Sequence, residues 1–175
     1  MCSSFFYLYL ERTIMIKRIL GLDISLSSTG FAIIDVDTQT CECSVLKIGS
    51  TNTTKVKGRG RKLRLIHEQM VYLRDKYSPE VVVAEQPFSK HHKSTQAIYQ
   101  ATGIVQLVFS EHDIIWYAPG SLKKAVTQSG VSDKKTVADT LEGIFEGIEF
   151  QNDDESDAVG VVVTHIELSE EFTNG

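Results

Sequence analysis

Three short apolar segments separated by polar turns dominate the first third of the chain. Residues 18–22 are mainly apolar and end at Asp23, and two further apolar runs follow at 30–36 and 43–50. The polar residues 37–40 between the last two runs are typical of a turn. Short spacings of this kind predict antiparallel strands joined by hairpins.

The rest of the chain alternates between helical and strand-like segments. Residues 51–62 are polar and contain glycine, which indicates a loop, and apolar residues at helical spacing then predict a helix over 63–77. The continuous apolar run at 81–85 is typical of a central strand covered on both faces. The elements expected after it are a helix over 94–112, a strand over 113–118, a short helix from Pro119, a helix capped by Ser132 that runs to Phe145, and a last helix over 154–168.

This order predicts an α/β fold with a mixed five-stranded sheet, in which three antiparallel strands are followed by parallel strands and helices cover both faces. We expect strand 81–85 to lie beside and parallel to strand 18–22. No linker rich in Pro, Gly or Ser divides residues 15–175, so they are expected to form a single domain. Residues 1–14 are expected to be a loosely ordered extension, and translation could start at Met15 instead of Met1.

Composition and charge narrow the class of protein. The 175 residues are 42% hydrophobic and 23% charged, which is typical of a globular protein, and no apolar run approaches the roughly 20 residues of a membrane helix. The net charge is −5, but residues 1–132 hold 16 Lys and Arg against 11 Asp and Glu, whereas residues 133–175 hold 2 against 12. A basic surface able to bind nucleic acid can therefore coexist with an acidic end. The three cysteines provide no set of zinc ligands, and they fit a reducing cytoplasm.

Four acidic residues stand at the ends of predicted elements. Asp23 ends the first strand, Glu85 ends the fourth, and Asp154 and Asp157 lie one turn apart on one face of the last helix. Sites form at the carboxyl ends of parallel strands, and clustered carboxylates suit Mg²⁺ or Mn²⁺. Two such ions could activate a water and stabilise the leaving oxygen of a phosphodiester. Taken singly, each acid also has an ordinary explanation as a helix cap, a turn residue or a loop acid.

Several segments together resemble the RuvC family of Holliday-junction resolvases, in the RNase H-like superfamily. The resemblance covers residues 17–167 and is carried by the segments ILGLDISLSSTGFAII, VVVAEQPF, SLKKAVTQSGVSDKK and DDESDAVGVVVTH. It implies a homodimeric, Mg²⁺-dependent endonuclease, with Mn²⁺ as a substitute and two ions per active site. Such an enzyme nicks two strands of a four-way DNA junction symmetrically. The family's four-acid site falls on Asp23, Glu85, Asp154 and Asp157.

One departure concerns the turn after Asp23, where Ile24 and Ser25 stand in place of the family's usual Pro and Gly. Divergence of this kind suits a phage-type member with a broader preference for branched DNA. Its location would be the cytoplasm of a bacterium or of a phage-infected host.

Basic residues provide candidates for DNA contacts. Residues 55–64, named here the basic segment, carry six basic residues and no acid; a solvated surface loop is the alternative interpretation. The resemblance implies that Lys123 and Lys134 hold phosphates beside the metal ions, and that Phe88 stacks on a base. The full set of expected DNA-binding residues is Lys55, Lys57, Arg59, Arg61, Lys62, Phe88, Lys90, Lys93, Lys124 and Lys135.

Other functions remain open at this point. An actin-like ATPase also begins with a strand, an acid and a turn rich in hydroxyl groups and glycine, but it needs two domains, so this chain would be only a fragment of one. A ribonuclease H acting on RNA–DNA hybrids and an inactive DNA-binding relative share the fold. The apolar helix expected at 94–112 has more hydrophobic surface than one sheet face needs, which predicts a twofold dimer through this helix.

Overall fold

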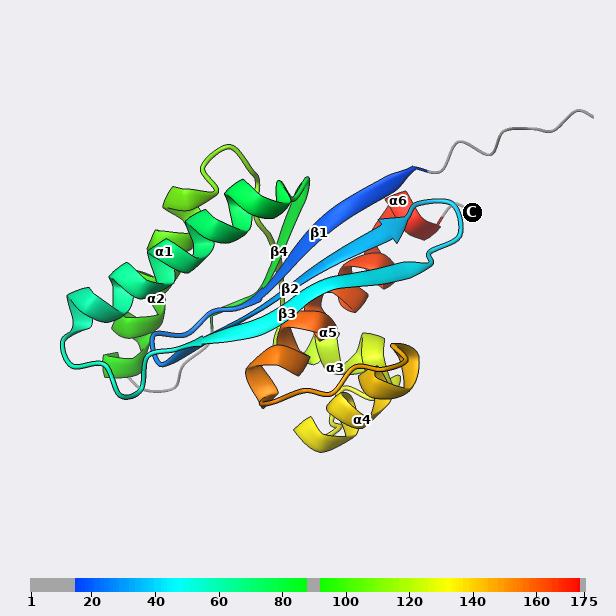
Figure 1. Ribbon diagram of the computed structural model, residues 1–175. Coiled ribbons are helices and arrows are strands. Elements are labelled where there is room, and N and C mark those ends of the chain that lie inside the picture. The colour runs from blue at the N-terminus through cyan, green and yellow to red at the C-terminus, as the bar shows by residue number, and fades with distance from the viewer. Residues whose placement is uncertain (1–14, 88–91, 174–175) are drawn as a thin grey trace, which may run out of the picture.

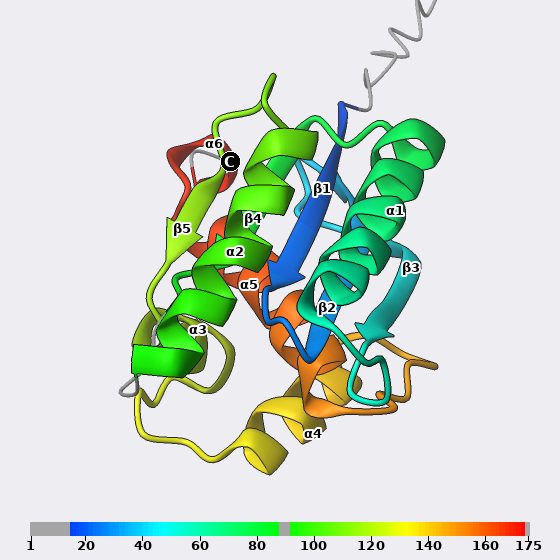
Figure 2. The ribbon, with the colours of Figure 1, turned by 90° about the vertical axis from the view of Figure 1, so that its left-hand side faces the viewer.

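A mixed sheet of five strands forms the centre of the protein, of which the computed structural model describes residues 15–87 and 92–173. The strands lie in the order β3-β2-β1-β4-β5 (Figures 1 and 2). β2 is antiparallel to both of its neighbours, whereas β1, β4 and β5 are mutually parallel, which confirms the predicted sheet. The strands are β1 Ile16–Asp23, β2 Ser28–Asp37, β3 Cys43–Asn52, β4 Val81–Glu85 and β5 Ile115–Tyr117.

Helices cover both faces of this sheet. α1 and α2 lie together on one face, and α5 covers the other face with α3 and α4 beside it (Figures 1 and 2). Within the described part of the chain, no helix is both long enough and apolar enough to cross a membrane. The helices are α1 Arg59–Tyr77, α2 His92–Val108, α3 Pro119–Thr127, α4 Lys134–Ile144, α5 Asp153–Leu168 and α6 Glu170–Thr173.

Alternation of side chains along the central strands supplies two cores, one on each face. In β1, Leu20 and Leu22 pack with α1 and α2, whereas Ile19 packs with α3, α4 and α5. In β4, Val82 and Val83 divide between the same two cores. Since both faces of these strands are buried, their apolar runs are continuous, as the sequence indicates.

Two predicted boundaries on the first helical face are wrong. α1 begins at Arg59, inside the segment predicted as a loop, so Arg59, Arg61 and Lys62 lie in its first turn. The loop ends at Gly58, whose φ of 89° lies in the region that favours glycine. α2 ends at Val108 instead of continuing to His112.

The cap predicted for α4 is also wrong by one residue. The Asp133 carboxylate, and not the Ser132 hydroxyl, accepts a hydrogen bond from the backbone N–H of Thr136 at 2.8 Å. The Ser132 hydroxyl is instead hydrogen-bonded to the Thr127 hydroxyl at 2.7 Å. The short helix α6 has no counterpart among the predicted elements. The N-terminal extension, residues 1–14, lies outside the described residues, so the start at Met15 stays a prediction.

Candidate metal centre and DNA interface

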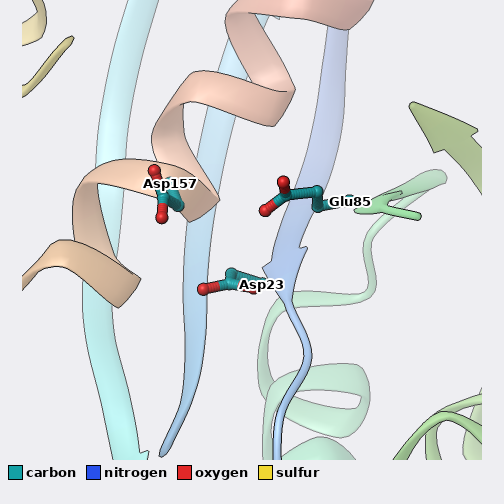
Figure 3. Close-up of side chains that lie close together, drawn as sticks. All are labelled: Asp23, Glu85 and Asp157. Atoms are coloured by element: carbon teal, nitrogen blue, oxygen red, sulfur yellow. The ribbon is translucent and has the colours of Figure 1, made fainter. Parts of the chain in front are cut away.

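Three carboxylates from separate elements meet at the end of the sheet where the parallel strands β1 and β4 terminate. Asp23, Glu85 and Asp157 each place an oxygen so that these atoms lie within 4.8 Å of one another (Figure 3). All three side chains are partly exposed, and among the described residues they form the one group of potential metal ligands that lies this close together. We name this group the acidic cluster.

Strand register brings two members of the acidic cluster side by side. Leu22 of β1 pairs with Ala84 of β4, so the residues that follow them, Asp23 and Glu85, end neighbouring parallel strands. Side chains alternate along a strand, and Val83 faces the α5 side. Asp23 and Glu85 therefore point to the face that α5 covers. This position at the carboxyl ends of parallel strands is the one predicted from the sequence.

Glycines in the strands let α5 approach closely enough to supply the third carboxylate. A Cβ added at Gly21 would lie 2.2 Å from the carbonyl oxygen of Ala158. A Cβ added at Gly30 would lie 1.9 Å from the carbonyl oxygen of Asp154. Any larger residue at these two positions would push the first turns of α5 away from the sheet, and Asp157 with them.

The beginning of α5 is fixed by a reciprocal cap. The Asn152 side chain accepts a hydrogen bond from the backbone N–H of Glu155 at 3.2 Å, and the Glu155 carboxylate accepts one from the N–H of Gln151 at 2.8 Å. Glu155 is buried, and these contacts satisfy its side-chain oxygens. The predicted start of this helix at Asp154 is therefore off by one residue. Asn152 is the signal that could have corrected it.

The fourth predicted acid, Asp154, lies outside the acidic cluster. Its backbone packs against Gly30, while its side chain is near enough for its charge to affect Asp23. Its role as a ligand stays a prediction.

Burial and mutual repulsion shape the electrostatics of the acidic cluster. Burial and the nearby charge of Glu85 raise the pKa of Asp23 well above its ordinary value, and the charges of Asp157 and Asp154 act in the same direction. Burial and the charge of Asp157 raise the pKa of Glu85 from 4.5 to about 7. Negative charge is therefore under-compensated here, and an all-oxygen ligand set with this imbalance fits a hard divalent cation.

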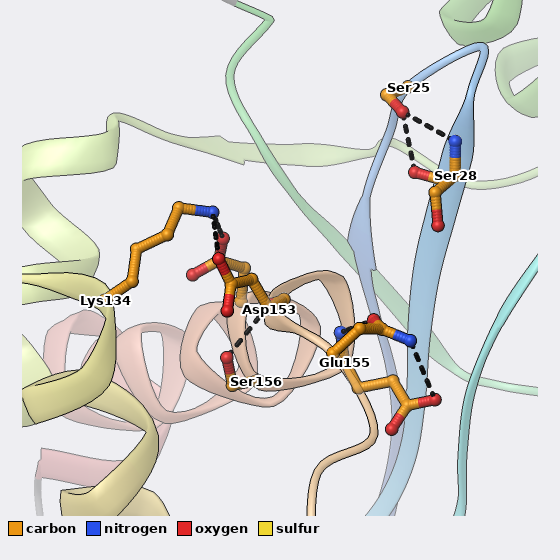
Figure 4. Close-up of polar contacts among 8 residues, drawn as sticks. Ser25, Ser28, Lys134, Asp153, Glu155 and Ser156 are labelled. Atoms are coloured by element: carbon orange, nitrogen blue, oxygen red, sulfur yellow. Dashed lines mark hydrogen bonds and ion pairs between the residues drawn. The ribbon is translucent and has the colours of Figure 1, made fainter. Parts of the chain in front are cut away.

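Two lysines line the hollow that contains the acidic cluster. Lys123 of α3 and Lys134 of α4 border this hollow of about 250 Å³. The Lys134 ammonium lies 2.9 Å from Asp157 and 3.6 Å from Asp153 (Figure 4). Asp157 therefore has a basic partner that lies on another helix, 23 residues earlier in the sequence. Sequence reasoning also missed Asp153.

The two neighbouring lysines have different surroundings. Lys124 is exposed and borders a separate hollow with Gln128 and Glu167, so it does not face the acidic cluster. Lys135 is exposed and forms no ion pair with any residue that the structure describes.

Hydroxyl groups hold the turn that departs from the family pattern. The Ser25 hydroxyl accepts from the N–H of Ser28 at 3.0 Å and donates to the Ser28 carbonyl at 2.6 Å (Figure 4). The Thr29 hydroxyl donates to the Ser25 carbonyl at 2.7 Å. These hydroxyls are used within the turn, which disfavours the phosphate cradle that an ATPase would need.

The basic segment lies next to the same turn. The backbone N–H of Thr53, just before the segment, donates to the carbonyl of Ser27 at 2.8 Å. Four of the five predicted DNA-binding residues of this segment are exposed, and Lys62 is partly exposed. Positive charge thus flanks the sheet edge that carries the acidic cluster. Phe88, Lys90 and the side chain of Lys93 lie outside the described residues, so their roles stay predictions.

Comparisons with known proteins agree with this architecture. The fold matches that of "T. thermophilus RuvC in complex with Holliday junction substrate" with a TM-score of 0.78 at 21% identity, covering 86% of this chain and 93% of that one. It also matches the yeast mitochondrial Holliday junction resolvase Ydc2, with a TM-score of 0.65 at 14% identity over 90% of this chain and 82% of that one. The strand order and this likeness thus define a protein with an RNase H-like fold.

Sequence comparison gives the family. The family described as "Crossover junction endodeoxyribonuclease RuvC" matches residues 19–165. The protein of that name from Wolbachia sp. subsp. Brugia malayi (strain TRS) is 32% identical over 152 residues, which cover 85% of this chain and 93% of the relative. The chain belongs to the RuvC family. This membership confirms the resemblance and does not favour the ATPase or hybrid-nuclease alternatives.

Proposed function

We propose that this protein is a structure-selective endonuclease that resolves four-way DNA junctions, and related branched DNA, by paired symmetric nicks. The single observation that carries this proposal is the convergence of three carboxylates from β1, β4 and α5 within 4.8 Å. Membership of a family of crossover junction endodeoxyribonucleases supports the choice of substrate.

Two Mg²⁺ ions, replaceable by Mn²⁺, are the proposed cofactors. The acidic cluster would hold them, with Asp154 as a further candidate ligand. The raised pKa values of Asp23 and Glu85 support this assignment: burial and, after it, repulsion between the carboxylates raise them, and a bound cation would compensate this negative charge. Bound there, the ions would activate a water and stabilise the leaving oxygen of a phosphodiester.

Positive side chains would position the DNA. Lys123 borders the acidic cluster and is proposed to hold the phosphate next to the scissile bond, together with Lys134. The basic segment would bind the sugar–phosphate backbone of a neighbouring arm of the DNA junction, since the segment begins beside the turn that follows Asp23.

A homodimer would present two such sites to the two strands that are cut. α2 exposes two large apolar side chains, with 59% of Tyr99 and 66% of Leu107 accessible to solvent. These apolar residues support the proposed contact between two copies through α2. Light scattering after gel filtration should therefore give the mass of a dimer at micromolar concentration. The cytoplasm is the proposed location.

A cleavage panel tests the proposed activity. Four-way, three-way, flap, linear duplex and RNA–DNA hybrid substrates are incubated with and without Mg²⁺. The four-way junction should be cut fastest, and only with the cation. Preferential cutting of the hybrid would instead favour a ribonuclease H, and equal cutting of linear duplex would refute structure selectivity.

Two variants link this activity to the acidic cluster. Asp23→Asn should abolish cutting and leave junction binding intact, because it removes one carboxylate from the cluster. Asp139→Asn makes the same change at an exposed position of α4 and should cut like the wild type. Retained cleavage by the Asp23→Asn variant would remove Asp23 from the site.

A further inference from the structure

Lys134 occupies an unusual place for a residue expected to bind phosphate. It is the first residue of α4, and its ammonium reaches across to the first turns of α5 (Figure 4). There it lies 2.9 Å from an Asp157 carboxylate oxygen and 3.6 Å from one of Asp153.

The two ends of this contact differ in exposure. The Asp157 side chain is 13% exposed, whereas the Lys134 side chain is 56% exposed. More than half of the Lys134 side chain is in contact with water, so its ammonium has solvent to move into when it leaves the carboxylate. The carboxylate that it contacts cannot move in the same way.

The charges around the contact keep the ammonium protonated. Partial burial opposes its charged form, but the hydrogen bond to Asp157 and the charges of Asp157, Asp153 and Asp23 outweigh it and raise the pKa of Lys134. In turn, the charge of Lys134 offsets part of the rise in the pKa of Asp23 and of Glu85. A single ammonium thus compensates part of the negative charge of the whole acidic cluster.

A divalent cation in the cluster would require the same carboxylate. Asp157 supplies one of the three ligand atoms that lie within 4.8 Å of one another. An ammonium and a divalent cation side by side on this carboxylate would repel each other at short range.

We propose that Lys134 is an exchangeable counter-ion, which holds the metal-free acidic cluster together and leaves Asp157 when a divalent cation binds. The inference rests on the proposed function, since it takes the cluster to be the metal centre. Lys134 thereby lowers the affinity of the site for cations. Once displaced, its ammonium is available to a DNA phosphate.

Mn²⁺ binding measured without DNA tests this inference. Isothermal titration calorimetry compares the wild type with Lys134→Gln and with Lys135→Gln, which removes the same charge from the next residue. Lys134→Gln should bind Mn²⁺ about fivefold more tightly, corresponding to about 1 kcal/mol. Lys135→Gln should stay within about twofold of the wild type, because its charge lies in solvent and is screened.

Melting temperatures separate this role from a purely structural ion pair. In EDTA, Lys134→Gln should melt about 2–4 °C below the wild type, because the carboxylates have lost their counter-ion. At saturating Mn²⁺ this deficit should disappear. An equal deficit in both conditions, or unchanged Mn²⁺ affinity, would overturn the proposal. Because more than half of the Lys134 side chain is exposed, the variant is expected to fold, which circular dichroism checks.

An Asp157→Asn control distinguishes failure of this inference from failure of the proposed function. If wild-type Mn²⁺ binding does not depend on Asp157, the metal centre itself is refuted. If binding depends on Asp157 but Lys134→Gln changes nothing, only the counter-ion role is refuted.

Discussion

The carboxylate of Glu85 should destabilise the metal-free protein at neutral pH, so replacing it by glutamine should raise the melting temperature. Burial and the charge of Asp157 raise its pKa from 4.5 to about 7. The Glu85 carboxyl therefore stays protonated to a higher pH in the folded state than in the unfolded state. The resulting stabilisation is complete below about pH 4.5 and is lost as the pH rises through about 7.

The size of this change in stability follows from the rise in the pKa of Glu85. At about 1.36 kcal/mol per pH unit, the shift sets an upper limit of roughly 3 kcal/mol. Since Glu85 is partly exposed, solvent screening reduces the expected value to about 1–2 kcal/mol, or about 3–6 °C in melting temperature. This gain is expected at pH 8, where the wild-type carboxylate is charged, and should vanish at pH 4 to 5.

Thermal melts in EDTA across this pH range provide the assay. Glu85→Gln is compared with the wild type and with Glu111→Gln, which makes the same change at an exposed position. Only the first variant should gain stability as the pH rises, and Mn²⁺ should reverse the order by stabilising the wild type more. A Glu85→Gln variant that melts below the wild type at pH 8, or a difference that does not vary with pH, would refute the reasoning.

Three further predictions test packing, an internal ion pair and the DNA interface. Gly30→Ala should lose about 1–3 kcal/mol in urea unfolding and weaken Mn²⁺ binding, whereas Gly60→Ala, with open space at its Cβ, should be neutral or stabilising. Arg18→Lys should lose about 1–2 kcal/mol, because lysine cannot form the two hydrogen bonds of 2.7 and 2.8 Å to Asp35; equal stability would contradict this. Neutralising Lys55, Lys57, Arg59 and Arg61 of the basic segment should weaken junction binding. The slope of log K against the logarithm of the salt concentration should become shallower by up to about 0.9 per lost phosphate contact, and an unchanged slope would remove the segment from the interface.

The centre of the sheet could be predicted because β1, β2 and β4 are apolar on both faces. Their runs are continuous, their ends carry isolated acids, and parallel neighbours bring such ends together. Asp23 and Glu85 therefore lie where the sequence indicates. The contribution of Asp157 was predictable for a different reason, since it follows from helical spacing and from the resemblance to a known family.

The start of α1 could not be read from the same pattern. Its first turn is built from glycine and basic residues, a composition typical of loops, and the apolar periodicity begins only at Leu63. Similarly, Ser132 and Asp133 are both good caps, and only the bond of Ser132 to Thr127 decides between them. The partner of Lys134 was hidden because the lysine and its carboxylates lie about 20 residues apart and meet only through the packing of α4 on α5.

The glycines at positions 21 and 30 indicate that another element packs closely against β1 and β2, which an interpretation of each strand by itself does not reveal. Glycine inside a strand weakens it, so its presence within two buried strands needs a reason outside the strand. That reason is α5, whose backbone carbonyls lie where the two Cβ atoms would be. A helix that packs this closely at its first turns carries Asp157 to within reach of two strand-end carboxylates. The close approach of α5 that assembles the acidic cluster also causes the repulsion between its carboxylates. Gly30 and Lys134 therefore have opposite effects on the same electrostatic energy: the glycine brings the negative charges together, and the lysine compensates them until a cation binds.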